Sequence, residues 1–139
     1  MRQLYVTAGG MEPELLGVLS EVTPASNEDP FHSDGTYMFK YTIGGKFHKP
    51  WMKISKLDNP EGVYVGDSVF HSILRQVLPS GNFKPFLAEA LKQFGMPEYD
   101  EWEWLRNHCH GSTSRLIQIF ETLPENTVAF QEIPKLIND

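Results

Sequence analysis

Apolar and polar positions alternate over residues 3–8, a period of two that is typical of half-buried β-strands, and residues 15–22 form an apolar run that contains one glycine. Residues 3–8 and 15–22 are rich in strand-forming side chains and are separated by the turn residues Gly9 and Gly10. The two segments are therefore predicted to pair as neighbouring strands. Residues 24–35 contain many turn-forming side chains and are predicted to form a polar loop.

The alternation resumes after this loop. Residues 36–43 place aromatic and aliphatic side chains at every second position, which predicts a third strand. The glycine pair at positions 44–45 ends this strand. Residues 51–56 are predicted to form a fourth extended segment, because their side chains again alternate.

A different spacing begins near residue 67, where apolar positions recur at helical intervals. Asp67 or Ser68 is predicted to cap the first helix, and Pro79 with Gly81 is predicted to end it. The buried face of this helix is predicted to comprise Val69, Phe70, Ile73, Leu74 and Val77.

Two shorter helices are predicted to follow. Residues 82–94 form the second helix, with Pro85 in its first turn and Gly95 as its stop. Asp100 is predicted to cap the third. Trp102 and Trp104 lie two positions apart on this helix and cannot share one face, so we expect one of the two rings to be buried.

The last part of the chain returns to a strand pattern at residues 115–120, and residues 127–130 are a candidate extended segment. This order of elements predicts an α+β fold. We expect a small antiparallel sheet in a barrel-like N-terminal half, followed by three short helices and a returning strand. At 139 residues the chain is predicted to form a single domain, 1–139.

Composition limits the function classes that are open to the chain. Eighteen acidic and twelve basic residues give a net charge of −6, which disfavours direct binding of nucleic acid. A single cysteine cannot form an internal disulfide, and no leader pattern follows Met1, so a cytoplasmic location is expected. No apolar run approaches the ~18 residues that a membrane-spanning helix needs, so no membrane association is predicted.

The most unusual stretch places His108, Cys109 and His110 in consecutive positions. Zinc sites usually combine about four ligands in spaced pairs, so a metal site here is disfavoured. Cys109 is not expected to be a nucleophile, because a helix C-terminus raises the pKa of a thiol. A small buried side chain is the better interpretation of this residue. The histidines can offset the negative end of the helix dipole. Residues 111–115 could form a nest of N–H groups for an anion, but a turn that begins at Gly111 is the simpler prediction.

Acidic residues gather at the start of the third predicted helix. Four of them lie between positions 98 and 103, where carboxylates favour the positive end of the helix dipole. They are therefore predicted to be solvated and not to form an acid–base pair. No nucleophile–base pair, phosphate loop or paired ligand motif is found in the sequence, so we expect no enzymatic activity, no metal and no other cofactor.

Five stretches of sequence follow one another in a recognisable order. They are LYVTAGG, LLGVLSE, TYMFKY, SVFHSILRQVLPSGNFKPFLAEAL and EWEWLRNHCHGSTSRLIQI, and together they span residues 4–119 of a resemblance that covers roughly residues 4–123. In order and spacing they resemble the N-terminal, non-catalytic subdomain of HipA-type serine/threonine kinases. They resemble especially the separately encoded version of that subdomain, the HipS family of tripartite HipBST toxin–antitoxin systems.

This resemblance implies a function in binding. HipS proteins dock on a HipA-like kinase toxin of the HipT type and keep it inactive, partly through an aromatic side chain presented from a loop toward the active-site region. A HipB-like protein supplies the DNA-binding part of the complex. The chain is therefore expected to be an antitoxin. The alternatives are a small metal-dependent hydrolase that uses the His108-Cys109-His110 cluster, or a generic immunity or adaptor protein with another partner.

Five residues are predicted to contact the partner. Phe83 is the first candidate for the inhibitory ring, because a flexible Ser-Gly turn beside an aromatic residue can project a rigid side chain. Pro79, Asn82 and Phe86 belong to the same segment. Trp51 is the second candidate, and burial of its ring on the sheet face is an equally good interpretation.

Overall fold

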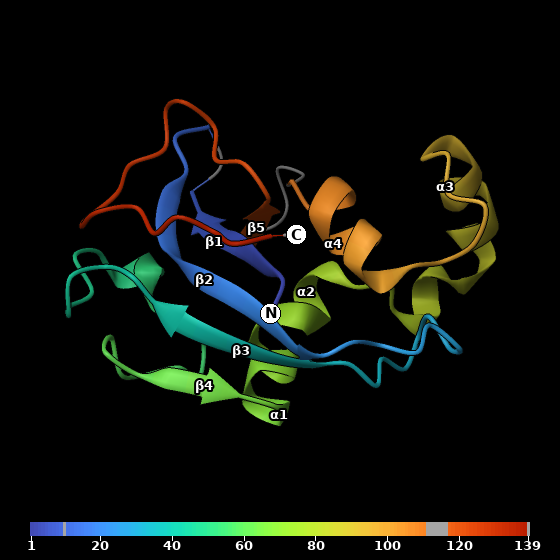
Figure 1. Cartoon of the computed structure of the whole chain (residues 1–139), viewed down its shortest axis with the longest axis horizontal. Helices are drawn as coiled ribbons and strands as arrows, with labels where there is room; N and C mark the ends of the chain where they lie inside the picture. Colours follow the sequence, from blue (N-terminus) through green and yellow to red (C-terminus); the bar gives the residue numbers. More distant parts are fainter. Residues whose placement is uncertain (10, 111–116, 139) are drawn as a thin grey trace.

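The computed structural model describes residues 1–9, 11–110 and 117–138. Its centre is an antiparallel sheet of five strands in the order β4-β3-β2-β1-β5 (Figure 1). The predicted α+β class, with an antiparallel sheet and a returning strand, is confirmed. Because β4 and β5 lie at opposite edges, the sheet is open, and the expected barrel-like shape is wrong. The strands are β1 (Gln3–Ala8), β2 (Glu14–Thr23), β3 (Thr36–Tyr41), β4 (Val63–Val65) and β5 (Ile117–Phe120).

The fourth strand lies later in the chain than the pattern predicts. Pro50 opens a 3-10 turn, η1 (Pro50–Met52), and Lys56 has a φ of 70°. A positive φ is incompatible with a strand, so the prediction of an extended segment at residues 51–56 is wrong. On the side away from β2, β3 pairs with β4. β4 has only three residues, too few for an alternating pattern to be recognised in the sequence.

The first predicted helix consists of three joined pieces, α1 (Asp67–Val69), η2 (Phe70–Leu74) and α2 (Arg75–Val77). The middle piece is a π-helical turn in which the Arg75 N–H reaches the Phe70 carbonyl. Neither Asp67 nor Ser68 caps the segment, because Gly66, with a φ of 80°, precedes its first turn. The predicted apolar face is confirmed by four fully buried side chains, Val69, Ile73, Leu74 and Val77.

The second predicted helix begins as a 3-10 segment, η3 (Gly81–Phe86), and continues as α3 (Leu87–Gln93). Gly95 follows its end with a φ of 69°, so the predicted stop is confirmed. The third helix is α4 (Glu101–His108). Asp100 caps it as predicted, because its Oδ1 accepts a hydrogen bond of 3.0 Å from the Glu103 N–H.

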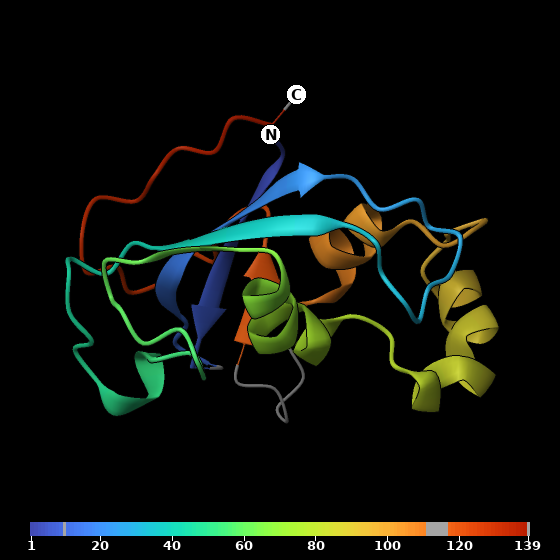
Figure 2. The ribbon, with the colours of Figure 1, turned by 90° about the horizontal axis from the view of Figure 1, so that it is seen from below.

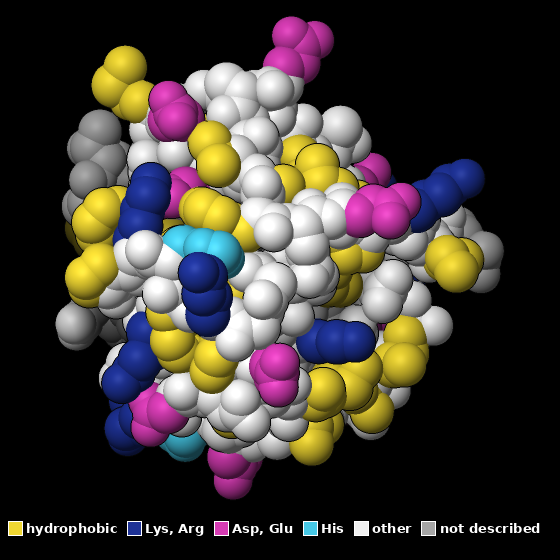
Figure 3. All heavy atoms as spheres, turned by 90° about the vertical axis from the view of Figure 1, so that its left-hand side faces the viewer, with side chains coloured by type: hydrophobic (Ala, Val, Ile, Leu, Met, Phe, Trp, Pro, Cys, Tyr) yellow, Lys and Arg dark blue, Asp and Glu magenta, His cyan; other side chains and the backbone are white. Residues whose placement is uncertain are grey.

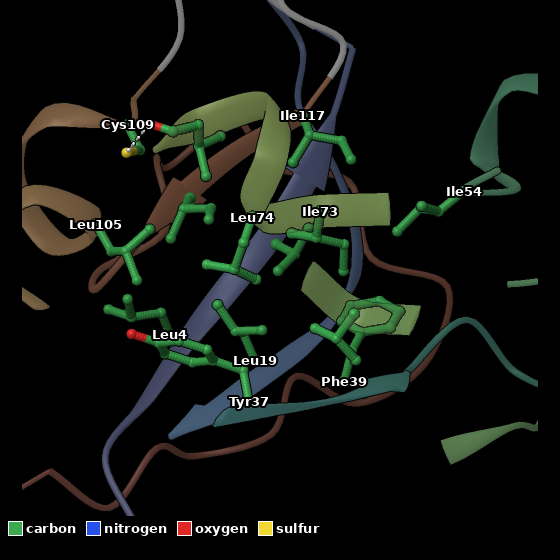
Figure 4. Close-up of a cluster of buried hydrophobic side chains, with 14 of the residues drawn as sticks. Leu4, Leu19, Tyr37, Phe39, Ile54, Ile73, Leu74, Leu105, Cys109 and Ile117 are labelled. Atoms are coloured by element: carbon green, nitrogen blue, oxygen red, sulfur yellow. Dashed lines mark hydrogen bonds between the residues drawn. The ribbon is translucent and has the colours of Figure 1, made fainter. Parts of the chain in front are cut away.

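The main core lies between the sheet and the helical segment formed by α1, η2 and α2. Figure 2 shows these helices on one side of the sheet and the C-terminal tail on the other. In the close-up of the core, Leu74 points toward Leu19 of β2 and Ile73 points toward Phe39 of β3 (Figure 4). All four side chains are fully buried.

Both tryptophans of α4 are buried, so the expectation that only one ring is buried is wrong. Trp102 and Trp104 are 6% and 5% exposed. The Trp104 indole N–H donates a hydrogen bond of 2.9 Å to the Val77 carbonyl at the end of α2. On the other face of α4, the Arg2 guanidinium lies 4.6 Å from the centre of the Trp102 ring. The helix is therefore packed on two faces at once.

Glu101 is also buried, which corrects the prediction that the acids of this helix are solvated. Its side chain is 2% exposed and accepts a hydrogen bond of 2.5 Å from the Tyr37 hydroxyl. Its backbone N–H donates to Asn27 Oδ1 at 2.9 Å. Burial raises the pKa of Glu101. The hydrogen bond from the Glu101 N–H to Asn27 joins the polar loop of residues 24–35 to α4.

The C-terminal tail, residues 121–138, crosses the face of the sheet opposite the helices (Figure 2). The candidate extended segment at residues 127–130 contains one parallel bridge, between Val128 and Glu14. A second, smaller core cluster lies under the tail and consists of Tyr5, Leu15 and Val18 with Leu123 and Leu136 packed on it. Three predicted features lie outside the described residues: Gly10 of the first turn, the start of the returning strand at residues 115–116, and the turn or nest at residues 111–115.

Candidate functional site

The residues predicted to bind a partner lie at two opposite ends of the molecule (Figure 1). Asn82, Phe83 and Phe86 belong to η3, beside α3, and Pro79 shortly precedes it. Trp51 belongs to η1, at the far end of the sheet. The five residues therefore do not form one site.

Phe83 is held in place against the helices. It is half-buried, and its ring lies 6.1 Å, centre to centre, from the buried ring of Trp104. Its backbone N–H donates a hydrogen bond of 2.9 Å to the Ser80 carbonyl. Gly81 is the first residue of the 3-10 segment. The Phe83 ring is therefore packed on Trp104 in this structure and does not project freely from the turn, and its contact with a partner stays a prediction.

Among the predicted aromatic residues at this end, Phe86 is exposed, with 61% of its surface accessible to solvent. Phe94, which follows α3, is 41% exposed and stacks on His108 with ring centres 3.8 Å apart. We call Phe86 and Phe94 the α3 surface. Asn82 is exposed beside it, whereas Pro79 is buried. Sequence reasoning missed Phe94 as a surface residue because its helical spacing is that of a core position.

Trp51 is both exposed and fixed. Its side chain is 55% exposed, and its indole N–H donates a hydrogen bond of 2.7 Å to Glu14 Oε1. The Lys49 ammonium lies 2.8 Å from Glu14 Oε2 and 5.3 Å from the centre of the Trp51 ring. Glu14, at the start of β2, is only 4% exposed and anchors both side chains. The interpretation of Trp51 as a buried sheet-face residue is wrong.

A groove of about 230 Å³ lies beside Trp51. Lys53 and Gln76 supply polar atoms to its wall. We call Lys49, Trp51, Lys53 and this groove the Trp51 surface. Figure 3 looks at this end of the molecule and shows basic, acidic and hydrophobic side chains interspersed on it. The apolar wall of the groove includes Ala8, Leu16, Ile54 and Ile117.

Lysines are concentrated around Trp51. Residues 36–57 contain five of the eight lysines of the chain and no acidic residue. Lys53 pairs with the exposed Asp58 at 3.0 Å, so part of this charge is neutralised from outside the segment. The net charge of −6 therefore does not describe residues 36–57, whose own charged side chains are all basic, although Glu14 and Asp58 from outside the segment pair with Lys49 and Lys53.

The side chains of His108, Cys109 and His110 have separate environments. Cys109 is buried, as expected, with its Sγ 3.4 Å from the Trp104 carbonyl oxygen. Burial lowers the pKa of His108, which disfavours the protonated ring expected at a helix end. His110 Nε2 lies 3.0 Å from the Arg106 carbonyl oxygen. The part of the chain that the structure describes contains no group of three or more possible metal ligands.

Comparisons of the chain with protein-family models, with curated proteins and with solved structures found no match. The resemblance to the HipS family therefore stays a prediction from the sequence. Within residues 1–9, 11–110 and 117–138, every helix is too short or too polar to cross a membrane.

Proposed function

We propose that the protein is an antitoxin that binds and inhibits a HipA-like serine/threonine kinase of the HipT type, in a complex that also contains a DNA-binding HipB-like protein. The proposal starts from the order of the sequence stretches shared with the HipS family. The structural observation that supports it is Trp51, an exposed ring held on a short turn. In this function the chain performs no catalytic step and needs no cofactor.

Trp51 has the properties of an interface anchor. Tryptophan is enriched among the few residues that dominate the free energy of protein association. The hydrogen bond to Glu14 and the contact with Lys49 restrict the ring before a partner arrives, so docking costs little conformational entropy. These properties favour Trp51 over Phe83, whose ring already packs on Trp104.

The lysines near Trp51 also favour Trp51 over Phe83 as the residue that contacts the kinase. Protein kinases hold their magnesium ions with an aspartate and an asparagine and use a second aspartate as catalytic base. On the Trp51 surface, Lys49 lies over the ring and Lys53 lines the adjoining groove. A ring inserted into the active-site cleft would bring these ammonium groups toward the aspartates and compete with the magnesium-bound nucleotide. The chain would then inhibit by occupying the cleft.

The test begins with purification of the tagged protein from its native host. A kinase of the HipA type should co-purify, and an equimolar amount of the protein should stop autophosphorylation of that kinase. Trp51→Ala should weaken binding by about 2 kcal/mol, or roughly 30-fold in Kd. Phe86→Ala is the matched control, because it removes an exposed ring at the opposite end and should leave inhibition intact.

Circular dichroism of both variants establishes that they fold. Failure of any kinase to co-purify would contradict the antitoxin proposal. Full inhibition by Trp51→Ala, or loss of inhibition in Phe86→Ala alone, would contradict the assignment of Trp51 and move the contact to the α3 surface.

A further inference from the structure

The C-terminal tail lies on the face of the sheet opposite α1 and α2 (Figure 2), and hydrogen bonds attach it at Val128, near its middle, and at Asn138, near its end. The Val128 N–H donates a hydrogen bond of 2.8 Å to the Pro13 carbonyl. Asn138 Oδ1 accepts from the Gln3 N–H at 2.7 Å, and its Nδ2 donates to the Gln3 carbonyl at 2.9 Å. Between these attachments, a groove of about 310 Å³ separates the tail from β2 and β3. We call it the tail groove.

The tail groove combines positive charge with an apolar wall. Lys40 of β3 and Lys135 of the tail line it from its two sides. Its lining in the described part of the chain contains no acidic residue, and no ion pair there joins either lysine to an acid. Val18, Met38 and Leu136 supply apolar surface. Such a lining suits a molecule that is anionic at one end and apolar at the other.

Thr42 gives the tail groove an unused hydrogen-bonding atom. The residue lines the groove and is only 6% exposed. Its backbone N–H donates to the Leu16 carbonyl at 2.8 Å, but its Oγ1 has no hydrogen-bond partner among the described residues. A buried hydroxyl without a partner costs free energy, and native structures usually satisfy such groups. Because this oxygen is almost closed to solvent, a ligand oxygen in the groove would satisfy it only after the Thr42 side chain rotates about χ1.

We infer that the tail groove binds a small organic anion, a carboxylate or a phosphate that carries a short apolar chain. Lys40 and Lys135 supply the positive charge for the head group, the apolar chain lies on the apolar wall, and the Thr42 hydroxyl donates a hydrogen bond to the ligand after rotation of its side chain. The volume of the groove falls at the lower end of small-molecule sites, which span roughly 300–1,000 Å³. Because such a ligand contacts both the sheet and the tail, its binding stabilises the tail in its position on the sheet. This site is separate from the Trp51 surface, so the inference does not depend on the antitoxin proposal.

Isothermal titration calorimetry on the full chain tests the inference with three probes that each contain six carbon atoms: hexanoate, hexyl phosphate and hexylamine. Saturable one-to-one binding of hexanoate, hexyl phosphate or both is expected, together with a higher unfolding temperature. The two anions distinguish a carboxylate ligand from a phosphate ligand. Hexylamine, which reverses the charge, should not bind. Equal binding of hexylamine, or no binding of either anion up to about 10 mM, would overturn the inference.

Variants locate the binding. The double variant Lys40→Gln/Lys135→Gln should bind the anions at least about tenfold more weakly, because it removes both charges. Thr42→Val should weaken binding while the unliganded protein keeps its thermal stability, since the lost hydroxyl has no partner to leave unpaired. Lys92→Gln, on α3, is the control and should bind normally. Unchanged affinity in the double lysine variant or in Thr42→Val would overturn the assignment.

Discussion

Replacement of Glu14 by glutamine should loosen Trp51 without altering the ring itself. The two carboxylate oxygens of Glu14 face different donors, the Trp51 indole N–H at 2.7 Å and the Lys49 ammonium at 2.8 Å. Glutamine keeps the volume of the side chain but provides one acceptor oxygen and no charge. It can therefore retain only one of the two contacts. We expect a lower free energy of unfolding and a more mobile indole.

The size of this effect follows from the exposure of the two donors. A hydrogen bond to a charged group contributes about 1.5–3 kcal/mol when buried, whereas an exposed ion pair contributes about 0–1 kcal/mol. Lys49 is 44% exposed, so the ion pair lies toward the lower range. Glu14→Gln should therefore lower the free energy of unfolding by about 1–2 kcal/mol, which corresponds to a fall of roughly 3–8 °C in Tm for a chain of this size.

Thermal unfolding followed by circular dichroism measures the loss, and the indole N–H resonance of Trp51, assigned with Trp51→Phe, reports on the ring. A double-mutant cycle with Lys49→Met should give a coupling energy of about 0.5–1 kcal/mol. Lys53→Met is the matched control, because Lys53 pairs with the exposed Asp58 and should change stability by less than about 0.5 kcal/mol. An unchanged Tm together with an unshifted indole resonance in Glu14→Gln would refute the anchoring role of Glu14.

The remaining predictions concern the packing and the protonation of the core. In urea titrations, Gly17→Ala should lower the free energy of unfolding by about 3 kcal/mol or abolish folding, because the added Cβ would lie 2.1 Å from the Lys40 carbonyl oxygen of β3. Gly81→Ala is the control and should be tolerated, because no atom lies within 4 Å of its added Cβ. Trp104→Phe should cost about 1–3 kcal/mol in urea unfolding, because the Val77 carbonyl loses its indole donor. Burial raises the pKa of Glu101 above its usual value, so the folded chain binds this proton more readily than the unfolded chain. Relative to Glu101→Gln, the native protein should gain stability as the pH falls through the raised pKa and lose it as the pH rises; parallel pH–stability curves would contradict this.

Elements with local signals could be predicted from the sequence. β3 stands out because aromatic residues recur at every second position, β1 and β2 stand out because they are rich in strand-forming apolar residues, and α4 begins where Asp100 provides a cap. β4 has no such signal, since its position depends on the pairing of Tyr64 with Phe39 of a distant strand. The burial of Trp102 also depends on a remote residue, Arg2. Sequence spacing indicates which residues share a face, but it does not reveal what packs on that face.

The candidate site shows the same limit. A serine and a glycine beside Phe83 suggested a projecting ring, but Trp104, more than twenty positions later, packs against it. Trp51 was a candidate from its residue type alone. The sequence could not indicate that it is fixed, because Glu14 lies 37 positions away and meets it only through the fold. The tail groove likewise joins Lys40 to Lys135 across the sheet and had no counterpart in the sequence pattern.

The distribution of charge, more than its sum, decides which partners fit this protein. A net charge of −6 argues against anionic partners only if the charges are evenly spread. Residues 36–57 hold five lysines and no acid. Two of them, Lys49 and Lys53, belong to the Trp51 surface and are paired with Glu14 and Asp58, whereas Lys40 lines the tail groove and has no ion pair among the described residues. The two proposed ligands, a kinase cleft lined by aspartates and a small organic anion, differ in size but share the negative charge that this segment favours. The α3 surface, built from Phe86 and Phe94, offers no comparable charge and would select a partner by shape and apolar contact alone.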